Sequence, residues 1–443
     1  MKIKKLRKLK KIMTNDQLYP ANMGLSPRVV DYVNQIESKM APSMEVPDCV
    51  AEYNQLKVLH AMQENRISEA HFAATTGYGY NDLGRSALEA VYAAIFKAES
   101  ALVRPQMVSG THALATALFG NLRPGDTLLS VTGAPYDTLQ AVIGIRPTSG
   151  SLSEYGIEYR QVDLTAEGGF DYDGIRSALL DFHLNVKMVA IQRSKGYAWR
   201  PSFSINQLSE LISFIKNINP NVLCMVDNCY GEFVEYKEPI EIGADLAVGS
   251  LIKNPGGGLA PAGGYIVGAK SYVEKAANWL TAPGLGMEVG PTLGVTATLM
   301  QGLFMAPQVV ASSVRGAVLA GAVFKKLGFS VLPDPMDVRT DIVQAIKIGS
   351  AEGVLAFCKG IQKASPVDSF VTPEGAPMPG YDHRVIMAAG AFIQGSSIEL
   401  SADAPLIPPF TVYMQGGLTR HHAKIGVISA MQELTNAGII QNQ

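Results

Sequence analysis

The sequence has little charge for its size. Charged side chains make up 17% of the 443 residues and apolar ones 47%, whereas an average soluble domain has about 25% charged residues. A disordered chain would show the reverse balance, with few apolar residues and a high net charge. The net charge of −2 argues against a compact nucleic-acid-binding module, which is basic. A surface so poor in charge predicts apolar area hidden between subunits of a homo-oligomer.

Cysteine is scarce. The four residues are Cys49, Cys224, Cys229 and Cys358. Four cysteines are too few for a disulfide-stapled scaffold of this length. None of them forms a CxxC pair or has metal-ligand spacing with a histidine, so no metal site is predicted. Reduced thiols in a chain without a secretory signal indicate the cytoplasm.

Long hydrophobic runs are also missing. A membrane-spanning helix needs about 20 predominantly apolar residues. The longest uncharged stretch worth testing, residues 289–314, is interrupted by Pro291, Gln301, Pro307 and Gln308. It is better interpreted as a buried or interface helix, and no membrane span is predicted.

Acidic residues are absent from the first 13 positions, MKIKKLRKLKKIM, which carry seven Lys and Arg. Such a segment is able to bind nucleic acid or anionic lipid. A secretory signal would continue into an apolar stretch, and none follows. The interpretation we favour is a basic, disordered arm over residues 1–25, because free termini are usually disordered.

The length suggests two or three domains. Residues 26–70 read as helical, with Ser26 and Pro27 as a plausible cap and first-turn proline. Apolar strands then alternate with helices: strands at 128–132, 187–192, 222–226, 246–249 and 265–268, helices at 111–119, 173–182 and 205–217. This alternation predicts an α/β fold, a mostly parallel sheet with helices on both faces, over residues 71–327. A different element order predicts a smaller α+β domain over residues 328–443.

Two charged residues close mostly apolar runs. Asp227 ends NVLCMVD and Lys253 ends LAVGSLIK. Ligands of open α/β sheets bind beyond the carboxyl ends of the strands, so both side chains are expected in one pocket. Pyridoxal 5′-phosphate (PLP) needs such a pair: a lysine that forms a Schiff base and an acid that keeps the ring nitrogen protonated.

A phosphate site is predicted where Ser109, Gly110 and Thr111 open a helix, because free N–H groups and the helix dipole favour an anion there. Ser250 offers another hydroxyl, and the ring of Tyr136 is placed to stack on a flat cofactor. The glycines at 256–258 also suggest close approach of a phosphate or ring to the backbone. Each feature alone is more simply a helix cap, a strand-end charge or packing; their joint order favours a PLP site.

That order resembles the fold-type I PLP enzymes of the Cys/Met metabolism group, the cystathionine lyases and methionine gamma-lyases, and within them the methionine gamma-lyase-like or aluminium resistance branch. The motifs that carry the resemblance are TTGYGYNDLGR, VSGTHALATALFG, MVDNCYGEFVE and GSLIKNPGGGLAPAGGYIVG. The resemblance implies that Lys253 is the Schiff-base lysine and Asp227 the partner of the ring nitrogen. It implies phosphate binding by Ser109, Gly110, Thr111 and Ser250, stacking by Tyr136, and active sites at the interfaces of a dimer of dimers, a homotetramer.

The sequence departs from that family at two places. The loop before the first long helix reads Tyr78-Gly79-Tyr80, without the arginine of the better-known lyases, and Glu399 stands where an arginine for the substrate carboxylate is expected. Tyr78 and Tyr80 become candidate proton donors to the leaving group. Candidate carboxylate ligands are Arg193 and Arg420, with Arg200 and Arg384 as alternatives.

The resemblance implies a PLP-dependent carbon–sulfur lyase that acts on a sulfur amino acid of the methionine, cystathionine or cysteine type. Lys253, its pKa expected to be lowered by burial and by the cationic ring, would remove the α-proton before β- or γ-elimination. Two alternatives remain open: a transferase that adds a thiol to an activated homoserine, and a non-catalytic PLP-binding protein.

Overall fold

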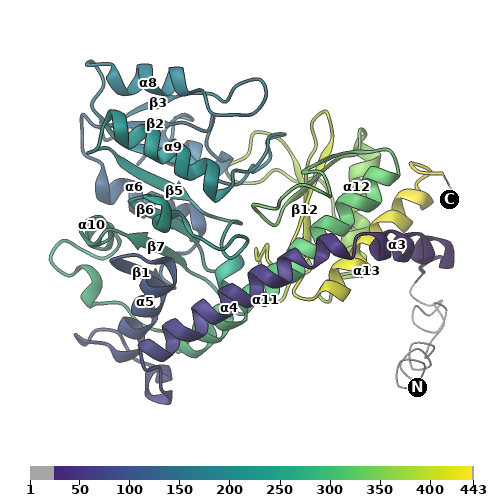
Figure 1. Ribbon diagram of the computed structural model, residues 1–443, viewed down its shortest axis with the longest axis horizontal. Coiled ribbons are helices and arrows are strands. Elements are labelled where there is room, and N and C mark those ends of the chain that lie inside the picture. Colours follow the sequence, from purple (N-terminus) through teal and green to yellow (C-terminus); the bar gives the residue numbers. More distant parts are fainter. Residues whose placement is uncertain (1–23, 442–443) are drawn as a thin grey trace.

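The computed structural model describes residues 24–441, so all but the end of the predicted basic arm lies outside the described residues. The described part starts with two helices, α3 (Pro27–Lys39) and α4 (Val46–Glu64). Pro27 occupies the first turn of α3, where its missing N–H is not needed. α4 runs diagonally along the molecule beside the long helix α11 (Thr296–Lys326) and contacts it (Figure 1).

The larger sheet has seven strands in the order β1-β7-β6-β5-β4-β2-β3. Their bounds are β1 (Ser100–Arg104), β2 (Thr127–Ser130), β3 (Glu158–Gln161), β4 (Val186–Gln192), β5 (Leu223–Asp227), β6 (Leu246–Ser250) and β7 (Gly264–Gly268). The neighbours from β6 through β5, β4 and β2 to β3 pair in parallel, and β7 is antiparallel to both β1 and β6. The predicted mostly parallel sheet is therefore confirmed.

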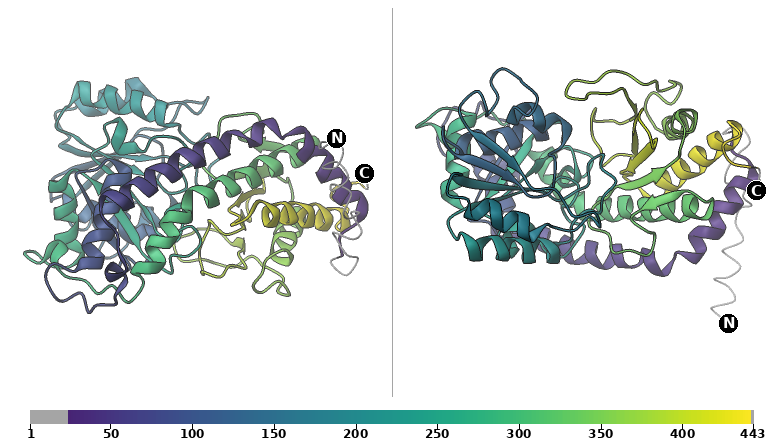
Figure 2. Two further views of the ribbon diagram at one scale, coloured as in Figure 1. Left: turned by 60° about the horizontal axis from the view of Figure 1, so that its bottom comes forward. Right: turned by 90° about the horizontal axis from the view of Figure 1, so that it is seen from above.

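Helices cover both faces of this sheet, as the right-hand view of Figure 2 shows. α6 (Gly110–Asn121), α7 (Asp137–Ile143) and α10 (Lys270–Leu280) pack on one face, and α8 (Tyr172–Leu180) and α9 (Ile205–Ile218) on the other. Successive residues of a strand point to opposite faces of the sheet. Leu128 packs in the hydrophobic cluster on the first face and Leu129 in the cluster on the second. Continuous apolar strands are typical of such doubly covered parallel sheets.

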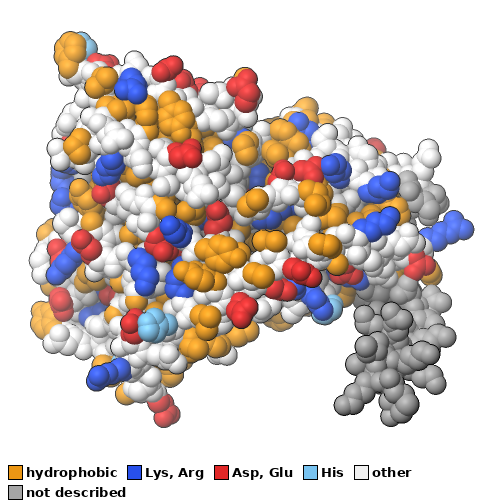
Figure 3. Space-filling model, in the orientation of Figure 1, with side chains coloured by type: hydrophobic (Ala, Val, Ile, Leu, Met, Phe, Trp, Pro, Cys, Tyr) orange, Lys and Arg blue, Asp and Glu red, His pale blue; other side chains and the backbone are white. Residues whose placement is uncertain are grey.

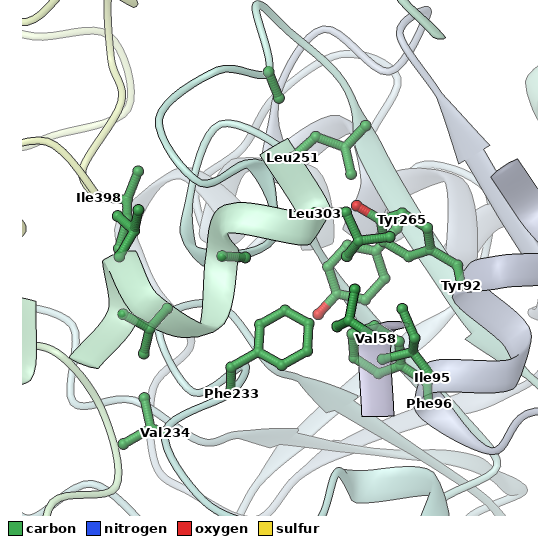
Figure 4. Packing of buried hydrophobic residues seen from close by; sticks show 14 of the residues in the cluster. Val58, Tyr92, Ile95, Phe96, Phe233, Val234, Leu251, Tyr265, Leu303 and Ile398 are labelled. Atoms are coloured by element: carbon green, nitrogen blue, oxygen red, sulfur yellow. The ribbon is translucent and has the colours of Figure 1, made fainter. Parts of the chain in front are cut away.

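A third group of buried side chains fills the space between β7 and the helices α4, α5 (Leu83–Phe96) and α11. Figure 4 shows the aromatic centre of this cluster, where the ring centroids of Phe96 and Tyr265 lie 5.2 Å apart. A side chain at Gly249 would place its Cβ 2.5 Å from the Tyr265 ring. The close packing at this end of β6 therefore requires glycine there.

The second sheet has five antiparallel strands in the order β10-β11-β12-β9-β8. The strands are β8 (Ser330–Leu332), β9 (Gln344–Lys347), β10 (Val385–Ala388), β11 (Ser401–Pro405) and β12 (Thr411–Gln415), and the helices α12 (Ala351–Lys363) and α13 (Arg420–Asn436) pack with them. This is the predicted smaller α+β unit. α3 also belongs to it, because Val29, Val30 and Val33 lie in its core.

α11 is long and apolar enough to cross a membrane by length and composition, and 78% of its most apolar window is buried inside the protein. It connects the two sheets as a core helix. Short 3₁₀ segments occur at Pro42–Met44, Glu69–Phe72, Pro239–Ile242, Asn254–Gly256 and Gly286–Glu288.

Apolar side chains reach the surface along α4. Figure 3 shows hydrophobic groups on the face that this helix crosses, with charges of both signs between them. Val46, Tyr53, Leu56 and Leu59 of α4 are exposed. These residues give α4 an apolar outer face, and the predicted burial of such a surface between subunits stays a prediction.

Candidate active site

A cavity of about 100 Å³ lies beyond the carboxyl ends of the parallel strands. Asp227 is the last residue of β5 and pairs with Val248 of the neighbouring β6, and Lys253 follows the end of β6 by three residues. Both line this cavity. Its full lining is Gly110, Thr111, Leu114, Tyr136, Thr138, Leu139, Gln192, Ser194, Gly196, Asp227, Cys229, Tyr230 and Lys253.

The Lys253 amine lies over an aromatic ring, with Nζ 4.1 Å from the centroid of Tyr230. Such a contact stabilises the charged form of the amine. Burial lowers the pKa of Lys253, but the acidic side chains around it raise the pKa above its ordinary value: Cys229, Tyr230, Asp227 and Glu232. The expected lowering of the lysine pKa depends on a cationic ring beside Lys253, and it stays a prediction.

The Asp227 carboxylate accepts hydrogen bonds from Cys229 in its own turn, and the bond from the Cys229 N–H to Oδ1 measures 3.1 Å. Burial raises its pKa above the ordinary value, and the nearby Lys253 and the bonds from Cys229 oppose this shift. A buried carboxylate of this kind gains most from a further cationic partner, because the low-dielectric surroundings penalise an unpaired charge.

The N-terminus of α6 forms one wall of the cavity. The Ser109 Oγ caps the helix by accepting the His112 N–H at 3.1 Å. The backbone N–H groups of Gly110 and Thr111 have no acceptor among residues 24–441, as expected for the first turn of a helix. A Cβ at Gly110 would lie 3.2 Å from the Ser250 Cβ. The missing side chain thus keeps open a space that suits an anion.

Tyr136 directly precedes α7 and lines the same cavity. Its N–H donates to Gln192 Oε1 at 2.8 Å, and its hydroxyl is hydrogen-bonded to that of Tyr381. An ideal Cβ at Gly196 would lie 3.1 Å from the Tyr136 ring. The ring is therefore held at both ends, in a position suited to packing on a flat ligand.

Arg193 is fully buried and does not line the cavity. Its guanidinium donates to Asn228 Oδ1 at 2.8 Å, to the Gly231 carbonyl at 3.0 Å and to Glu235 Oε2 at 2.6 Å. These bonds fix the turn that follows Asp227. We therefore assign Arg193 to the support of that turn and do not propose it as a substrate ligand.

Arg420 is exposed at the start of α13, where its Nε donates to His421. It lines a different cavity, together with Glu37 and Lys424. We do not propose it as a substrate ligand either.

Tyr78 and Tyr80 are 84% and 68% exposed and lie outside the cavity lining. Their loop is fastened to the segment before α11, because the Arg85 guanidinium donates to the carbonyls of Gly77, Glu288 and Gly290. Within one chain the two tyrosines do not reach the site, so a role in catalysis requires a second subunit.

Two other expectations change. The Glu399 carboxylate accepts the N–H groups of Phe392 and Ile393, both at 2.9 Å, and so holds a turn instead of facing a substrate. The glycines after Lys253 pack on other chain segments: a Cβ on Gly257 would lie 2.2 Å from the Gly302 carbonyl of α11, and one on Gly258 would lie 2.3 Å from Leu418. These two glycines allow the loop to pack closely on other segments. Of the glycines considered for phosphate binding, Gly110 alone lines the cavity.

Sequence reasoning missed Tyr230 and Glu232, although both lie in the quoted motif MVDNCYGEFVE. Tyr230 has φ = +74°, a backbone conformation that costs energy for residues other than glycine. Its hydroxyl accepts a hydrogen bond from the Ser397 hydroxyl at 3.2 Å. Its spacing after Asp227 was visible in the sequence, but the positive φ that turns its ring under Lys253 was not.

Glu232 is fully buried, and its Oε1 accepts the Tyr265 hydroxyl at 2.8 Å while Oε2 has no partner among the described residues. Burial raises its pKa to about 8. The folded chain thus holds the Glu232 proton between about pH 4.5 and 8, where the unfolded chain releases it. The free energy of unfolding should fall as the pH rises through this window.

Glu232→Gln should weaken that pH dependence, because an amide keeps the bond from Tyr265 and does not ionise. The unfolding temperature of wild type should fall relative to that of the variant when the pH rises from 6 to 8.5. We expect this relative change to be several degrees. Thermal unfolding of both proteins at the two pH values measures this, with Glu274→Gln at an exposed glutamate as the control. Parallel pH profiles for wild type and Glu232→Gln would contradict the prediction.

The sheet, with its lysine and aspartate at the carboxyl edge and a helix N-terminus beside them, defines the class: this is the fold of the fold-type I PLP enzymes. The PLP-dependent protein YhfS from Escherichia coli shares it, with a TM-score of 0.58, 15% identity and coverage of 87% of this chain and 96% of that one. The methionine gamma-lyase family model matches residues 29–435, and the chain belongs to that family.

Other proteins are more similar to this chain. The uncharacterized protein YnbB from Bacillus subtilis is 48% identical over 408 residues, which cover 92% of this chain and 96% of the relative. The crystal structure of a carbon-sulfur lyase involved in aluminum resistance from Clostridium novyi NT has a TM-score of 0.91 and 49% identity, covering 95% of this chain and all of the other. The predicted family resemblance is confirmed.

Proposed function

We propose that the protein is a PLP-dependent carbon–sulfur lyase that acts on a sulfur amino acid of the methionine, cystathionine or cysteine type. The observation that carries the proposal is the convergence of Lys253, Asp227 and the N-terminus of α6 on one cavity. Family membership and the 49% identical lyase from Clostridium novyi NT support the type of reaction.

The residues present fit PLP. The unpaired N–H groups of Gly110 and Thr111, with the Ser109 and Ser250 hydroxyls, would hold its phosphate, and Tyr136 would pack on its ring. Asp227 would bind the ring nitrogen and Lys253 the aldehyde carbon. When bound, PLP supplies an electron sink for the carbanion formed at the substrate α-carbon.

The chain's own groups then have separate tasks. Asp227 holds a proton at the ring nitrogen, and this added positive charge offsets one of the acidic groups that raise the pKa of Lys253. Lys253 Nζ accepts the α-proton, and the Tyr230 ring 4.1 Å away positions it. For γ-elimination, Lys253 would also move the β-proton.

Spectroscopy combined with product analysis tests this function. Purified protein loaded with PLP is titrated with methionine, cystathionine and cysteine, while its visible absorbance and the release of ammonia and 2-oxo acid are recorded. A lyase changes its spectrum and releases both products. Thiol incorporation into an activated homoserine without these products would indicate the transferase, and a spectrum without any turnover would indicate a binding protein.

We further propose a homo-oligomer, a dimer of dimers, with active sites at subunit interfaces, and a cytoplasmic location. The exposed apolar residues Tyr78, Tyr80 and Leu293 support the interface, because their loops lie side by side where Gly290 N–H donates to the Gly77 carbonyl at 2.9 Å.

Leu293→Glu should therefore dissociate the oligomer and lower activity, because a charge in an apolar interface is costly. Leu180→Glu is the matched control: Leu293 is 64% exposed and Leu180, on the distant helix α8, 63%. Light scattering coupled to size-exclusion chromatography should show a smaller mass for Leu293→Glu alone. An unchanged mass for both variants would rule out this interface.

A further inference from the structure

A second cavity, of about 270 Å³, adjoins the cavity lined by Lys253 and Asp227, which we call the PLP cavity. The two share Tyr136, Gln192 and Gly196 in their walls. The second cavity continues outward between the start of α7 and the strands β11 and β12 of the smaller sheet, where Pro405, Thr411 and Tyr413 line it. We call it the outer cavity. It has room for a part of a substrate that extends beyond the reacting atoms.

Three tyrosines line this cavity, Tyr136, Tyr197 and Tyr413. The Tyr197 centroid lies 5.8 Å from that of Tyr136 and 5.3 Å from that of Tyr413. The Tyr413 hydroxyl donates to the Tyr197 carbonyl, which ties the smaller sheet to this wall. Tyrosine faces of this kind attract a cation electrostatically.

Two polar side chains of the outer cavity have no hydrogen-bond partner in the part of the chain that the structure describes. The Asp137 carboxylate is half-buried, and His383 has a buried Nε2 without a partner. Arg146 is near Asp137, but its guanidinium donates to the carbonyls of Asp137 and Gly380 and to the carboxylate of Asp382. The Asp137 carboxylate therefore remains available to a ligand.

The Asp137 carboxylate is partly desolvated and has charged neighbours of both signs. Burial raises the pKa of Asp137, while His383 and Arg146 lower it and Asp382 raises it. An ammonium group beside Asp137 would form an ion pair with the partly desolvated carboxylate. The same group would lie close to the tyrosine rings of the outer cavity.

We propose that the outer cavity is a subsite for the far end of the substrate side chain, and that Asp137 selects thioether amino acids with an ammonium group beyond the sulfur. This inference rests on the proposed lyase function and narrows its substrate class. Asp137 also occupies the first turn of α7, where a carboxylate stabilises a helix without any ligand. The experiment must separate these two roles.

Two probes of nearly equal shape do so: S-(2-aminoethyl)-L-cysteine and S-propyl-L-cysteine, which differ by an ammonium in place of a methyl group. Binding to the PLP-loaded protein is measured by calorimetry, and KM and kcat by release of 2-oxo acid. The wild type should bind the aminoethyl compound about tenfold more tightly. Asp137→Asn should abolish that preference and leave the KM for the propyl compound within about twofold.

Asp173→Asn is the matched control, because Asp173 is a first-turn acid of α8 and lies outside both cavities. It should keep the full preference. A second variant, Ala198→Phe, fills the outer cavity at an exposed lining residue and should weaken both probes but not S-methyl-L-cysteine.

The outcomes are distinct. A wild type without preference, or an Asp137→Asn variant that retains it, overturns the subsite. A preference in binding that depends on Asp137, without cleavage of any probe, keeps the subsite and overturns the lyase function.

Discussion

Lys253→Ala should remove the visible absorbance of the PLP-loaded protein and lower turnover by roughly 10⁴-fold, the upper range for loss of a general base. The reason is that Lys253 is the only lysine that lines the PLP cavity within residues 24–441. The expected result is a protein that binds PLP without covalent attachment. Absorbance spectra before and after dialysis, together with 2-oxo acid release, measure both effects.

Removing the Lys253 charge leaves buried acids unpaired, so the fold needs its own control. Lys253→Arg keeps the positive charge beside Asp227 but lacks the amine, and it should lose the absorbance band while unfolding near the wild-type temperature. Lys270→Ala, at an exposed lysine, should change neither property. An unchanged visible band in Lys253→Ala would show that another residue binds the cofactor.

Asp227→Asn should keep the visible band and lower kcat by roughly 10²- to 10³-fold, the usual effect of removing one group that stabilises transition-state charge. An amide does not hold the ring nitrogen in its protonated form, so the carbanion is less well delocalised. Asp227 and Lys253 variants thus differ in signature: the first loses turnover alone, and the second loses turnover and absorbance. Spectra and steady-state kinetics on the same samples distinguish them.

Asp245→Asn is the matched control for Asp227→Asn. Asp245 directly precedes β6 and so lies at the amino ends of the parallel strands, away from the cavity. Its carboxylate accepts hydrogen bonds from the Cys224 N–H and the Lys216 amine, both at 2.7 Å. Its loss should lower stability by about 1–3 kcal/mol and leave kcat unchanged. Equal kcat values for wild type and Asp227→Asn would contradict the role of Asp227.

Much of the large sheet could be predicted because its signals are local. Each buried strand is a short apolar run, and the alternating helices force such strands into parallel pairing. Asp227 and Lys253 stand out because they end these runs, and parallel strands bring their carboxyl ends to one edge. The helix cap at Ser109 is equally local. The pairing of Lys253 and Asp227 in one cavity therefore followed from the order of residues alone.

Side chains with long-range partners could not be predicted. Arg193 follows a strand on the correct edge of the sheet, but its bonds to Gly231 and Glu235 turn it away from the cavity. The glycines after Lys253 looked like a ligand loop, but Gly257 packs on α11 and Gly258 on Leu418. In both cases the deciding partner lies tens of residues away, and spacing along the chain contains no information about it.

The sequence by itself determined the type of fold and the placement of Lys253, Asp227 and the start of α6 at one cavity, since periodicity and capping act over a few neighbouring residues. Only the tertiary structure decided how β7 is inserted antiparallel between β1 and β6, that α3 joins the smaller unit, and which tyrosines surround the site. Those outcomes depend on the burial of side chains from distant segments against one another. The Tyr230 ring lies against Lys253 because the packed turn after Asp227 holds a backbone conformation that Tyr230 would not adopt in isolation.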